Sequence, residues 1–309
     1  MAQSEISNPA VSIIIARVSA IDGSRIFETL DALQQQDGDV SFEIILADRI
    51  NDANSREIQG RHPEVHLIEC PTGTSIPRMR TIALNASRGS LIAITEDHCV
   101  PATDWLRGLV QAFADAPPDT MAVGGSIANG VDGSAFDRAT FLCEYAAFQA
   151  PVIEGPCGDL PGMNIAYRRS ALQAVDQNIL QTGFWESTLH PAFLSAGQAL
   201  YSTNRIKIQH RKTFCLQSFL RQRFLYSRHF AGSRAAGQTL PQRLAMLCLS
   251  ILLPPLLGGR LLRTLWVKRT SGAGTLSTLP YLSIFVMTAV CGELAGQLAG
   301  PGDALSRIE

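Results

Sequence analysis

The sequence predicts an α/β protein in which a mostly parallel sheet is flanked by helices and followed by a C-terminal region of apolar helices. Short β-branched runs alternate with helical patterns from Val11 to Glu96, an order typical of a doubly wound sheet. The first run, Val11–Ala16, suits a central parallel strand that is buried on both faces. Beyond Pro241 the chain becomes apolar over stretches of helical length.

The individual elements follow from periodicity and from helix-ending signals. After Val11–Ala16, Ile26, Leu30 and Leu33 lie on one face of a helix that ends at Asp37-Gly38. The further elements expected are strand 42–48, helix 55–60, strand 65–69, helix 77–87, strand 91–94, helix 105–114, strand 121–127, helix 136–149, a loop leading into a strand at 159–169, helix 187–196 and strand 199–209.

Acidic and imidazole side chains follow directly on the strand at Leu91–Ile94. Glu96, Asp97 and His98 come after it, and Pro101 closes the turn. In open α/β sheets, ligands bind just beyond the carboxyl ends of the strands. Two carboxylates and an imidazole in one turn repel unless a cation, a proton or a sugar hydroxyl joins them. A polar loop with incidental acids is the alternative interpretation of this stretch alone.

Four other polar residues are expected near the same rim of the sheet. Asp48 and His210 follow strands, Arg80 lies on the helix before the fourth strand, and Glu186 precedes a helix. Each has an ordinary alternative: a turn former, a strand-end histidine, a solvated helix residue and an acid favoured at a helix N-terminus, respectively. Taken together, they predict a functional site.

The order and spacing of these segments resemble those of the family 2 glycosyltransferases, which have the Rossmann-like GT-A fold. The similarity extends over about residues 9–212. Its most telling parts are the Arg-Gly-x-Leu-Ile-Ala segment at 88–93 and the Gly-x-Asn-x-Ala-Tyr-Arg-Arg segment at 162–169. The resemblance implies an inverting, hexosyltransferase-like transfer from a nucleotide-diphosphate sugar to a hydroxyl.

The resemblance also implies residue roles on the donor side. Asp48 corresponds to an acid that contacts the nucleobase, and Arg80 to a basic residue near the nucleotide phosphates. Glu96 and Asp97 fall in the Asp-x-Asp motif, which holds the ribose and the divalent ion that bridges the diphosphate.

Metal binding and catalysis fall to an overlapping set. By the same resemblance, Glu96, His98 and His210 are the metal ligands and Glu186 is the general base. A carboxylate in reach of the acceptor hydroxyl suits proton removal, and a divalent cation suits a leaving diphosphate. Imidazole ligands favour Mn²⁺ over Mg²⁺, and Mg²⁺ is the alternative.

The chain departs from the family pattern at several positions. Ala16-Arg17-Val18-Ser19 stands where Pro-Thr-Tyr-Asn is usual, and Arg49 replaces a second acid after Asp48. Trp185-Glu186 stands where a Glu-Asp pair is usual, which leaves one candidate base. Residues 217–226 do not match the Gln-x-x-Arg-Trp motif of processive synthases, so repeated chain elongation is disfavoured.

The predicted domains are a GT-A domain at 1–212, a basic amphipathic connector at 213–241 and a membrane-associated helical hairpin at 242–309. Residues 205–243 contain basic residues and no acid, which indicates an anionic membrane surface. The apolar stretches 244–259 and 276–299 flank a basic loop. If both spanned, the positive-inside rule would be violated, so a surface-lying or re-entrant hairpin is favoured. Helices packed on the protein's own surface are the alternative.

Composition excludes several other classes. Lys+Arg (26) and Asp+Glu (27) nearly balance, so no nucleic-acid partner is indicated. The seven cysteines are scattered without a CxxC pair, which argues against a zinc knuckle or a disulfide framework and for a reducing compartment. No signal peptide is recognised at the N-terminus. The catalytic domain is therefore expected on the cytoplasmic side of a membrane.

Two functional hypotheses remain at this point. The first is a membrane-attached, metal-dependent glycosyltransferase that acts once per acceptor on a hydroxyl of a lipid or glycan. The second is a degenerate GT-A domain that binds a nucleotide sugar or an assembly partner without turnover. A Rossmann dehydrogenase is disfavoured because no G-x-G-x-x-G follows the first strand.

Overall fold

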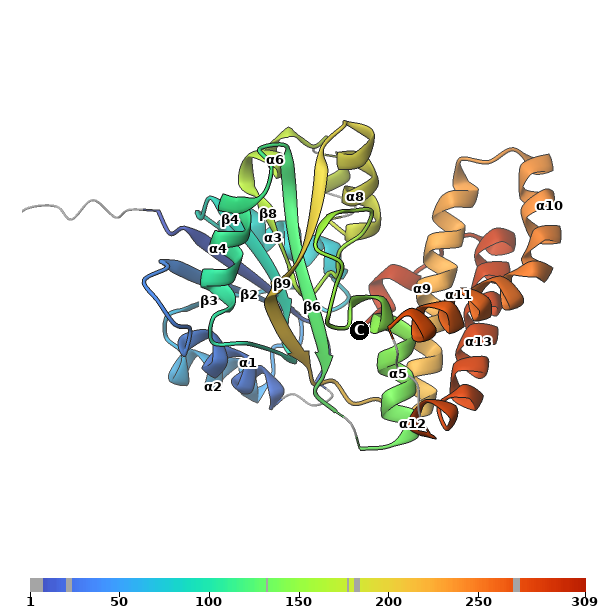
Figure 1. The fold of residues 1–309 in the computed structure, drawn as a ribbon, viewed down its shortest axis with the longest axis horizontal. Helices are drawn as coiled ribbons and strands as arrows, with labels where there is room; N and C mark the ends of the chain where they lie inside the picture. The colour runs from blue at the N-terminus through green and yellow to red at the C-terminus, as the bar shows by residue number, and fades with distance from the viewer. Residues whose placement is uncertain (1–7, 21–23, 132, 177, 181–183, 269–272) are drawn as a thin grey trace, which may run out of the picture. The chain divides into compact units, whose positions relative to one another are not determined.

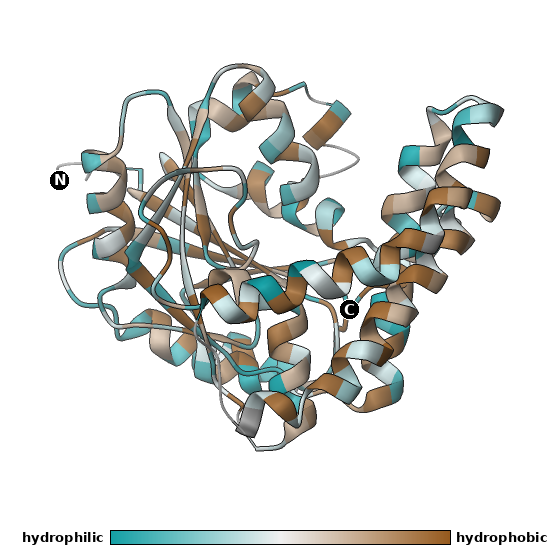
Figure 2. Cartoon of the chain, turned by 45° about the vertical axis from the view of Figure 1, so that its right-hand side comes forward, coloured by the Kyte–Doolittle hydropathy of each residue, from teal (hydrophilic) through white to brown (hydrophobic). Residues whose placement is uncertain are grey.

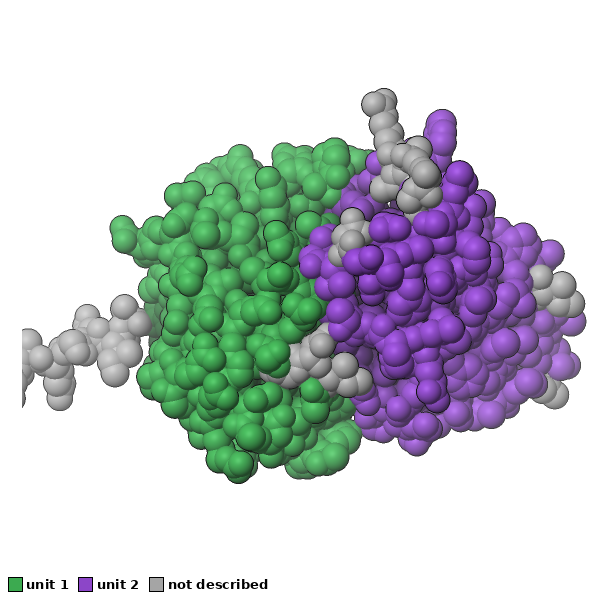
Figure 3. Space-filling view, turned by 90° about the horizontal axis from the view of Figure 1, so that it is seen from below, with its two compact units in different colours: residues 1–128, 150–211 green, residues 129–149, 212–309 purple. Residues whose placement is uncertain are grey.

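The computed structural model describes residues 8–20, 24–131, 133–176, 178–180, 184–268 and 273–309. These residues form two compact units, which Figure 3 colours separately: unit 1 comprises residues 1–128 and 150–211, and unit 2 comprises residues 129–149 and 212–309. Residues 129–149, which the sequence analysis grouped with the sheet, therefore cluster with the C-terminal helices.

Unit 1 contains a mixed sheet with the strand order β3-β2-β1-β4-β8-β6-β9-β5, and β7 pairs with β9 (Figure 1). The first four strands are parallel, and β8 joins β4 in the antiparallel direction. Strands β1–β4 are Val11–Arg17, Phe42–Asp48, Val65–Glu69 and Leu91–Glu96. The prediction of an α/β sheet flanked by helices is confirmed.

The parallel half forms where the sequence is most β-branched. Ile13, Ile14 and Ile15 are fully buried, as expected for a central strand covered on both faces. A helix connects each parallel strand to the next along the chain, as in β-α-β crossover units. They are α1 (Arg25–Gln34), α2 (Ala53–Arg61) and α3 (Ile76–Ala86).

The register brings the carboxyl ends of the parallel strands to one edge. Arg17 at the end of β1 pairs with Asp48 at the end of β2, and Ala16 pairs with Glu96 at the end of β4. The polar side chains that follow these strands therefore share one rim, as the sequence predicts.

The antiparallel half brings later segments to the same sheet. Its elements are β5 (Cys99–Pro101), α4 (Trp105–Asp115), β6 (Thr120–Asn129), β7 (Gly155–Cys157), β8 (Ile165–Arg168), α6 (Arg169–Ala174), α8 (Glu186–Ser195) and β9 (Ala199–His210). Fully buried Asn164 ties this half together: its side chain accepts from Trp105 Nε1 at 2.8 Å and donates to the carbonyls of Ser126 and Ile206 at 2.9 and 3.2 Å.

Unit 2 is helical. Its elements are α5 (Ala135–Tyr145), η1 (Ala146–Phe148), α9 (Leu216–Ala236), α10 (Leu240–Leu249), η2 (Ser250–Leu252), α11 (Leu253–Val267), α12 (Ala273–Leu276), α13 (Leu279–Ala299) and η3 (Ala304–Arg307). Apolar and polar residues are interleaved along these helices in Figure 2. The basic segment expected as a connector is largely α9, a continuous helix that packs against α13 (Figure 1).

By length and composition, α13 is the one described helix that could cross a membrane by itself. Residues Pro241–Leu249 and Leu253–Val267 meet the same criterion only as a pair, and they are bent by 57° at the break between them.

Candidate functional site

Three side chains with metal-ligating atoms converge at the carboxyl end of β4. Glu96 ends this strand, and the turn after it presents His98. Strand β5 pairs with β9 so that Cys99 lies opposite His210, which brings His210 beside His98. One ligand atom each from Glu96, His98 and His210 lie within 4.8 Å of one another. The sheet therefore unites residues separated by more than a hundred positions.

The geometry of this cluster is set by the facing imidazoles. His98 Nε2 lies 3.2 Å from His210 Nε2 and 3.1 Å from Glu96 Oε2. Both rings are buried and cross edge to face. One carboxylate oxygen and two imidazole nitrogens are a donor set that divalent transition metals accept. The residues present thus fit a divalent cation.

Asp97 contacts the other side of the His98 ring. Its Oδ1 lies 2.7 Å from His98 Nδ1. An ionised carboxylate can only accept, so His98 Nδ1 would donate to it, and in a neutral ring this leaves Nε2 as the nitrogen that could bind a cation. A carboxylate behind a histidine in this way fixes the ring as a metal ligand. The predicted contact of Asp97 with the nucleotide sugar stays a prediction.

Arg80 and Glu186 form a buried ion pair. Arg80 Nη1 lies 2.5 Å from Glu186 Oε1, and both side chains are almost excluded from solvent. Arg80 comes from α3, and Glu186 is the first residue of α8, where the helix dipole favours a negative charge. Arg80 Nη2 also approaches the Gly162 carbonyl at 3.4 Å, and the guanidinium lies 5.8 Å from the Trp185 ring centroid.

Gly162 leaves the space that the Glu186 carboxylate occupies. A Cβ at this position would lie 2.4 Å from both the Cδ and the Oε1 of Glu186. The glycine of the Gly-Met-Asn segment therefore has a packing reason: any side chain would displace this carboxylate.

Electrostatics link the ion pair to the three-residue cluster. Burial by itself would lower the pKa of Arg80, but the charges of Glu186 and Glu96 outweigh it and raise that pKa. The guanidinium therefore stays charged and is close enough to both carboxylates to be stabilised by them. Burial and the charge of Glu186 likewise raise the pKa of Tyr167 well above its usual value. The partly exposed Glu96 and the buried Glu186 thus both act electrostatically on Arg80.

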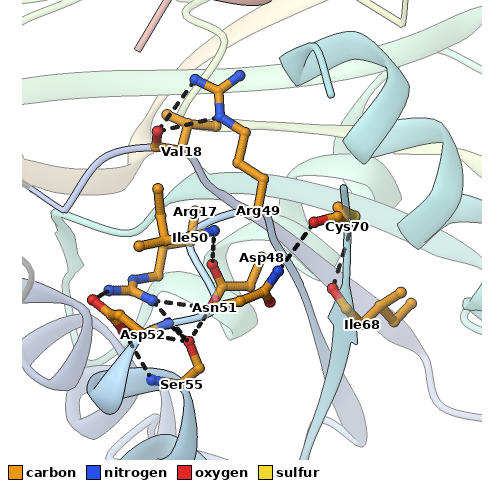
Figure 4. A network of polar contacts seen from close by, with 10 residues as sticks. All are labelled: Arg17, Val18, Asp48, Arg49, Ile50, Asn51, Asp52, Ser55, Ile68 and Cys70. Carbon is orange, nitrogen blue, oxygen red and sulfur yellow. Dashed lines mark hydrogen bonds and ion pairs between the residues drawn. The ribbon is translucent and has the colours of Figure 1, made fainter. Parts of the chain in front are cut away.

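Asp48 belongs to a second polar network at the same edge (Figure 4). It is fully buried; its Oδ2 accepts from Arg17 Nη1 at 2.9 Å and from Ser55 Oγ at 2.7 Å. Its Oδ1 accepts from the Ile50 backbone N–H at 2.8 Å. The nucleobase contact predicted for Asp48 is untested by this arrangement, which shows instead what holds the carboxylate in place.

Arg17 also belongs to this network, although its sequence position indicated only a departure from the family pattern. Its Nη2 lies 2.8 Å from Asp52 Oδ2, and the side chain is fully buried. Asp52 also caps α2 together with Ser55. The sequence signal for this pair was the position of the two residues. Arg17 ends a buried strand next to the strand that Asp48 ends, and a buried arginine there needs a carboxylate partner.

A further polar chain near Glu186 was not predicted. Tyr167 Oη lies 3.2 Å from His190 Nε2, and His190 Nδ1 lies 2.8 Å from Asp159 Oδ1. His190 follows Glu186 by four residues on α8, which puts both on one face of that helix. This spacing was the sequence signal for His190.

Comparison with solved structures shows a similarity of fold. The fold is similar to that of the mannosyltransferase PcManGT from Pyrobaculum calidifontis in complex with GDP-Man and Mn²⁺, with a TM-score of 0.56 and 18% identity over 94% of this chain and 88% of that one. TarS from S. aureus, in complex with UDP-GlcNAc, matches with a TM-score of 0.47 and 14% identity over 70% of this chain and 65% of TarS. No curated protein matches the sequence.

The fold is similar to that of a GT-A glycosyltransferase. The sequence model of Glycosyl transferase family 2 matches residues 12–176, more than half of the chain. The chain therefore belongs to family 2 of the glycosyltransferases, and the resemblance stated from its motifs is confirmed.

Proposed function

We propose that this enzyme transfers a sugar from a nucleotide-diphosphate donor to a hydroxyl acceptor with inversion, and that Glu186 is the general base. One observation carries the proposal: Arg80 pairs with Glu186 and is also stabilised by the charge of Glu96. A candidate base and a candidate cation site thereby adjoin a single buried guanidinium, as a reaction that needs both would require.

Glu96, His98 and His210 are the proposed metal ligands, and Asp97 orients His98. Two imidazoles beside one carboxylate favour Mn²⁺ over Mg²⁺. The presence of GDP-Man and Mn²⁺ in the structurally similar mannosyltransferase supports a nucleotide-sugar donor and this cation. A bound divalent cation would stabilise the negative charge of the departing diphosphate.

Glu186 and Arg80 divide the remaining work. The contact with Arg80 engages Oε1 of Glu186, so we assign Oε2 to accept the proton of the acceptor hydroxyl. Arg80 holds the carboxylate in place and adds positive charge toward the phosphate side. Positioning of this kind contributes several kcal/mol to the lowering of a barrier, roughly 7 or more in the best cases.

We assign the nucleobase side of the donor site to Asp48 and the ribose side to Asp97 with Glu96. Asp48 would act as part of its network with Arg17 and Asp52, because its own oxygens already accept three hydrogen bonds. The side chain of Asp52 is 32% exposed, so this network extends from the fully buried Asp48 to the solvent.

The proposed acceptor is a lipid or glycan hydroxyl at the cytoplasmic face of a membrane. Between Glu186 and Glu293 the chain contains no acidic residue, while basic residues recur throughout. A surface of this charge favours anionic lipid. We assign catalysis to residues 1–212 and membrane attachment to residues 242–309, with 213–241 as the basic connector.

The decisive experiment replaces the base. Glu186→Gln keeps the shape of the side chain but cannot take a proton, so turnover of UDP- and GDP-sugars with Mn²⁺ should fall by about 10²–10⁴-fold. Nucleotide binding, measured by calorimetry on the detergent-solubilised full chain, should be retained. Glu57→Gln, at an exposed position on α2, is the matched control and should match the wild type.

The same preparation tests the metal ligands and the competing hypothesis. His210→Ala should weaken Mn²⁺ binding measured by electron paramagnetic resonance, since one of three ligands is lost. Unchanged turnover in Glu186→Gln would remove Glu186 as the base. Nucleotide-sugar binding without any turnover by the wild type would instead favour a degenerate domain that binds donor or partner.

A further inference from the structure

Helix α13 has a packing partner that makes it a poor membrane span. Phe285 of α13 contacts Phe219 of α9 with ring centroids 4.5 Å apart. A Cβ on Gly292 or Gly296 would lie 2.4 or 2.5 Å from the carbonyl oxygens of Phe224 and Arg228. The two helices are therefore in close backbone contact over most of their length.

The partner helix α9 is too polar to enter hydrocarbon. Arg234 forms an ion pair with Glu293 of α13 at 2.7 Å, and Arg228 Nε donates to the Gly300 carbonyl at 3.2 Å. If α13 spanned a bilayer with α9 still attached, these charged groups and Arg221 would lie at membrane depth. An arginine at the centre of a span is strongly disfavoured, because its charge loses its hydration there. The α9–α13 pair is thus built to stay out of the bilayer core.

An apolar face without a described partner is found on α10 and α11 instead. Leu252, Leu256, Leu262 and Trp266 recur at spacings of four, six and four residues and lie on one side of the α11 helix axis. All four are exposed, with Trp266 at 77%. Leu244 and Leu249 of the preceding helix α10 are exposed as well. The opposite side of α11 packs within unit 2, where Leu265 is buried.

The charges on this face are all positive. Arg260 and Arg263 are exposed beside the leucines. No acid lies within α10 or α11, and the next one along the chain is Glu293. Long arginine side chains beside leucine and tryptophan suit the boundary between lipid headgroups and acyl chains. The occupant that matches both the apolar and the cationic part is an anionic phospholipid surface.

Neither helix of this pair is long enough to cross a membrane by itself. The 15 residues of α11 extend for about 22 Å, shorter than the ~30 Å hydrocarbon core. The bend of 57° before Pro254-Pro255 prevents α10 from extending it into one rod.

We propose that the exposed face of α11, formed by Leu252, Leu256, Leu262 and Trp266 with Arg260 and Arg263, lies flat on an anionic bilayer beside the exposed leucines of α10, so that the protein is attached to one leaflet without spanning it. This inference rests on the membrane attachment proposed above and specifies its surface and its mode.

The test is flotation of the full chain with vesicles of phosphatidylcholine alone and with added phosphatidylglycerol. We expect binding to the anionic vesicles only. Arg260→Gln/Arg263→Gln should weaken binding by about 30-fold, because each basic residue near an anionic surface strengthens binding by about fivefold and two are removed. Leu256→Glu/Leu262→Glu should abolish binding, because two acids would replace the inserted side chains.

A matched pair of substitutions on α13 separates lying from spanning. Met287→Glu/Leu298→Glu alters two residues of α13 that are as exposed as those on α11, and it should leave flotation unchanged. Loss of binding in this variant with retention in Leu256→Glu/Leu262→Glu would overturn the proposal in favour of a spanning α13.

Two further outcomes would also overturn it. Equal binding to neutral vesicles would remove the anionic surface as the partner. A concentration-dependent dimer that Leu256→Glu/Leu262→Glu abolishes, with no vesicle binding by the wild type, would assign the face to a second copy. Sugar transfer in detergent, measured on the same variants, should stay at the wild-type level. A failure of the membrane surface is thereby distinguishable from a failure of the catalytic assignment.

Discussion

At the scale of single residues, the position of the Glu186 carboxylate depends on the absence of a side chain at Gly162. Gly162 contributes no Cβ where the carboxylate lies, and Arg80 holds Oε1 at 2.5 Å. The Glu186 side chain thus occupies the space left by Gly162 and is held there by the ion pair with Arg80. Gly162 and Arg80 both belong to other segments of the chain.

Gly162→Ala should reduce kcat by about 10²-fold, because a displacement of the order of 1 Å at a catalytic group has that effect. The added Cβ would push the Glu186 carboxylate away from buried Arg80, so the free energy of unfolding should fall as well, and urea unfolding measures that loss. Gly60→Ala on α2, where no heavy atom lies within 4 Å of the added Cβ, is the control and should keep full activity. A fully active Gly162→Ala variant would show that the observed carboxylate position is not required.

Arg17 illustrates a different residue-scale effect, since its loss would leave a buried charge. Burial alone would lower its pKa, but Asp52 and Asp48 outweigh that effect and raise it. Arg17→Met should lower the free energy of unfolding by about 3–5 kcal/mol, because fully buried Asp48 would lose its cation. Urea unfolding measures this change.

Two comparisons sharpen the Arg17 prediction. Adding Asp48→Asn to Arg17→Met should recover part of the loss, since no unpaired charge would then remain. Arg205→Met breaks only the exposed ion pair with Asp115 and should cost less than about 1 kcal/mol. Equal losses in Arg17→Met and Arg205→Met would contradict the buried-charge argument.

At the scale of elements, Glu43 connects three segments of the parallel sheet. From β2 it accepts from Ser12 Oγ of β1 at 2.6 Å, from the Arg88 backbone N–H at 2.6 Å and from the Arg88 guanidinium at 3.0 and 3.1 Å. Burial would raise the pKa of this carboxyl, but the hydrogen bonds from Ser12 and Arg88 lower it overall. The alignment of β1, β2 and the segment before β4 is therefore favoured by the ionised form.

This contact should make stability depend on pH. Because the folded-state pKa of Glu43 lies below its ordinary value of 4.5, its contribution is fully present above about pH 4.5 and is lost as pH falls through the lowered value. The wild type should therefore lose more unfolding free energy between pH 6 and pH 3.5 than Glu43→Gln does. Urea titrations at both pH values measure this, with exposed Glu57→Gln behaving as wild type. Identical slopes in wild type and Glu43→Gln would contradict the assignment.

At the scale of the whole molecule, a nearly neutral chain conceals an uneven distribution of charge. The acids are concentrated before residue 187 and after residue 292, and the intervening stretch carries arginine and lysine alone among ionised groups. That stretch supplies α9, α10 and α11 of unit 2, whereas the acidic site residues belong to unit 1. Catalysis and lipid contact are thereby assigned to different units.

The exposed thiols can report this division in one experiment. Cys215, Cys248 and Cys291 are exposed, on or beside α9, α10 and α13, respectively, while Cys70 and Cys99 are buried. Hydrogen bonding with Ser218 lowers the pKa of the Cys215 thiol, so Cys215 should react fastest with a maleimide at pH 7. Anionic vesicles should protect Cys248 alone, as mass spectrometry of the labelled peptides would reveal. Protection of Cys291 would indicate insertion of α13.

The sequence determined the parallel half of the sheet and the family. The evidence came from local features: β-branched runs, helix signals and the Gly-x-Asn segment. Features of this kind can be recognised in the sequence because they involve residues that are close together along the chain. The same patterns correctly anticipated that acids and imidazoles follow the ends of parallel strands. They also indicated that Glu96, His98 and His210 lie on one rim, although the antiparallel pairing of β5 with β9 is what brings His210 beside His98.

Only the tertiary structure decided the pairings across that edge. Arg80 with Glu186, Arg17 with Asp48 and Gly162 beside Glu186 join segments that sequence spacing does not relate. It likewise placed residues 129–149 with the C-terminal helices and gave α13 a polar partner in α9. The physical reason is common to all of them. A buried charge or an apolar helix face is stabilised by whichever group the fold brings into contact with it, and distance along the chain does not determine that contact.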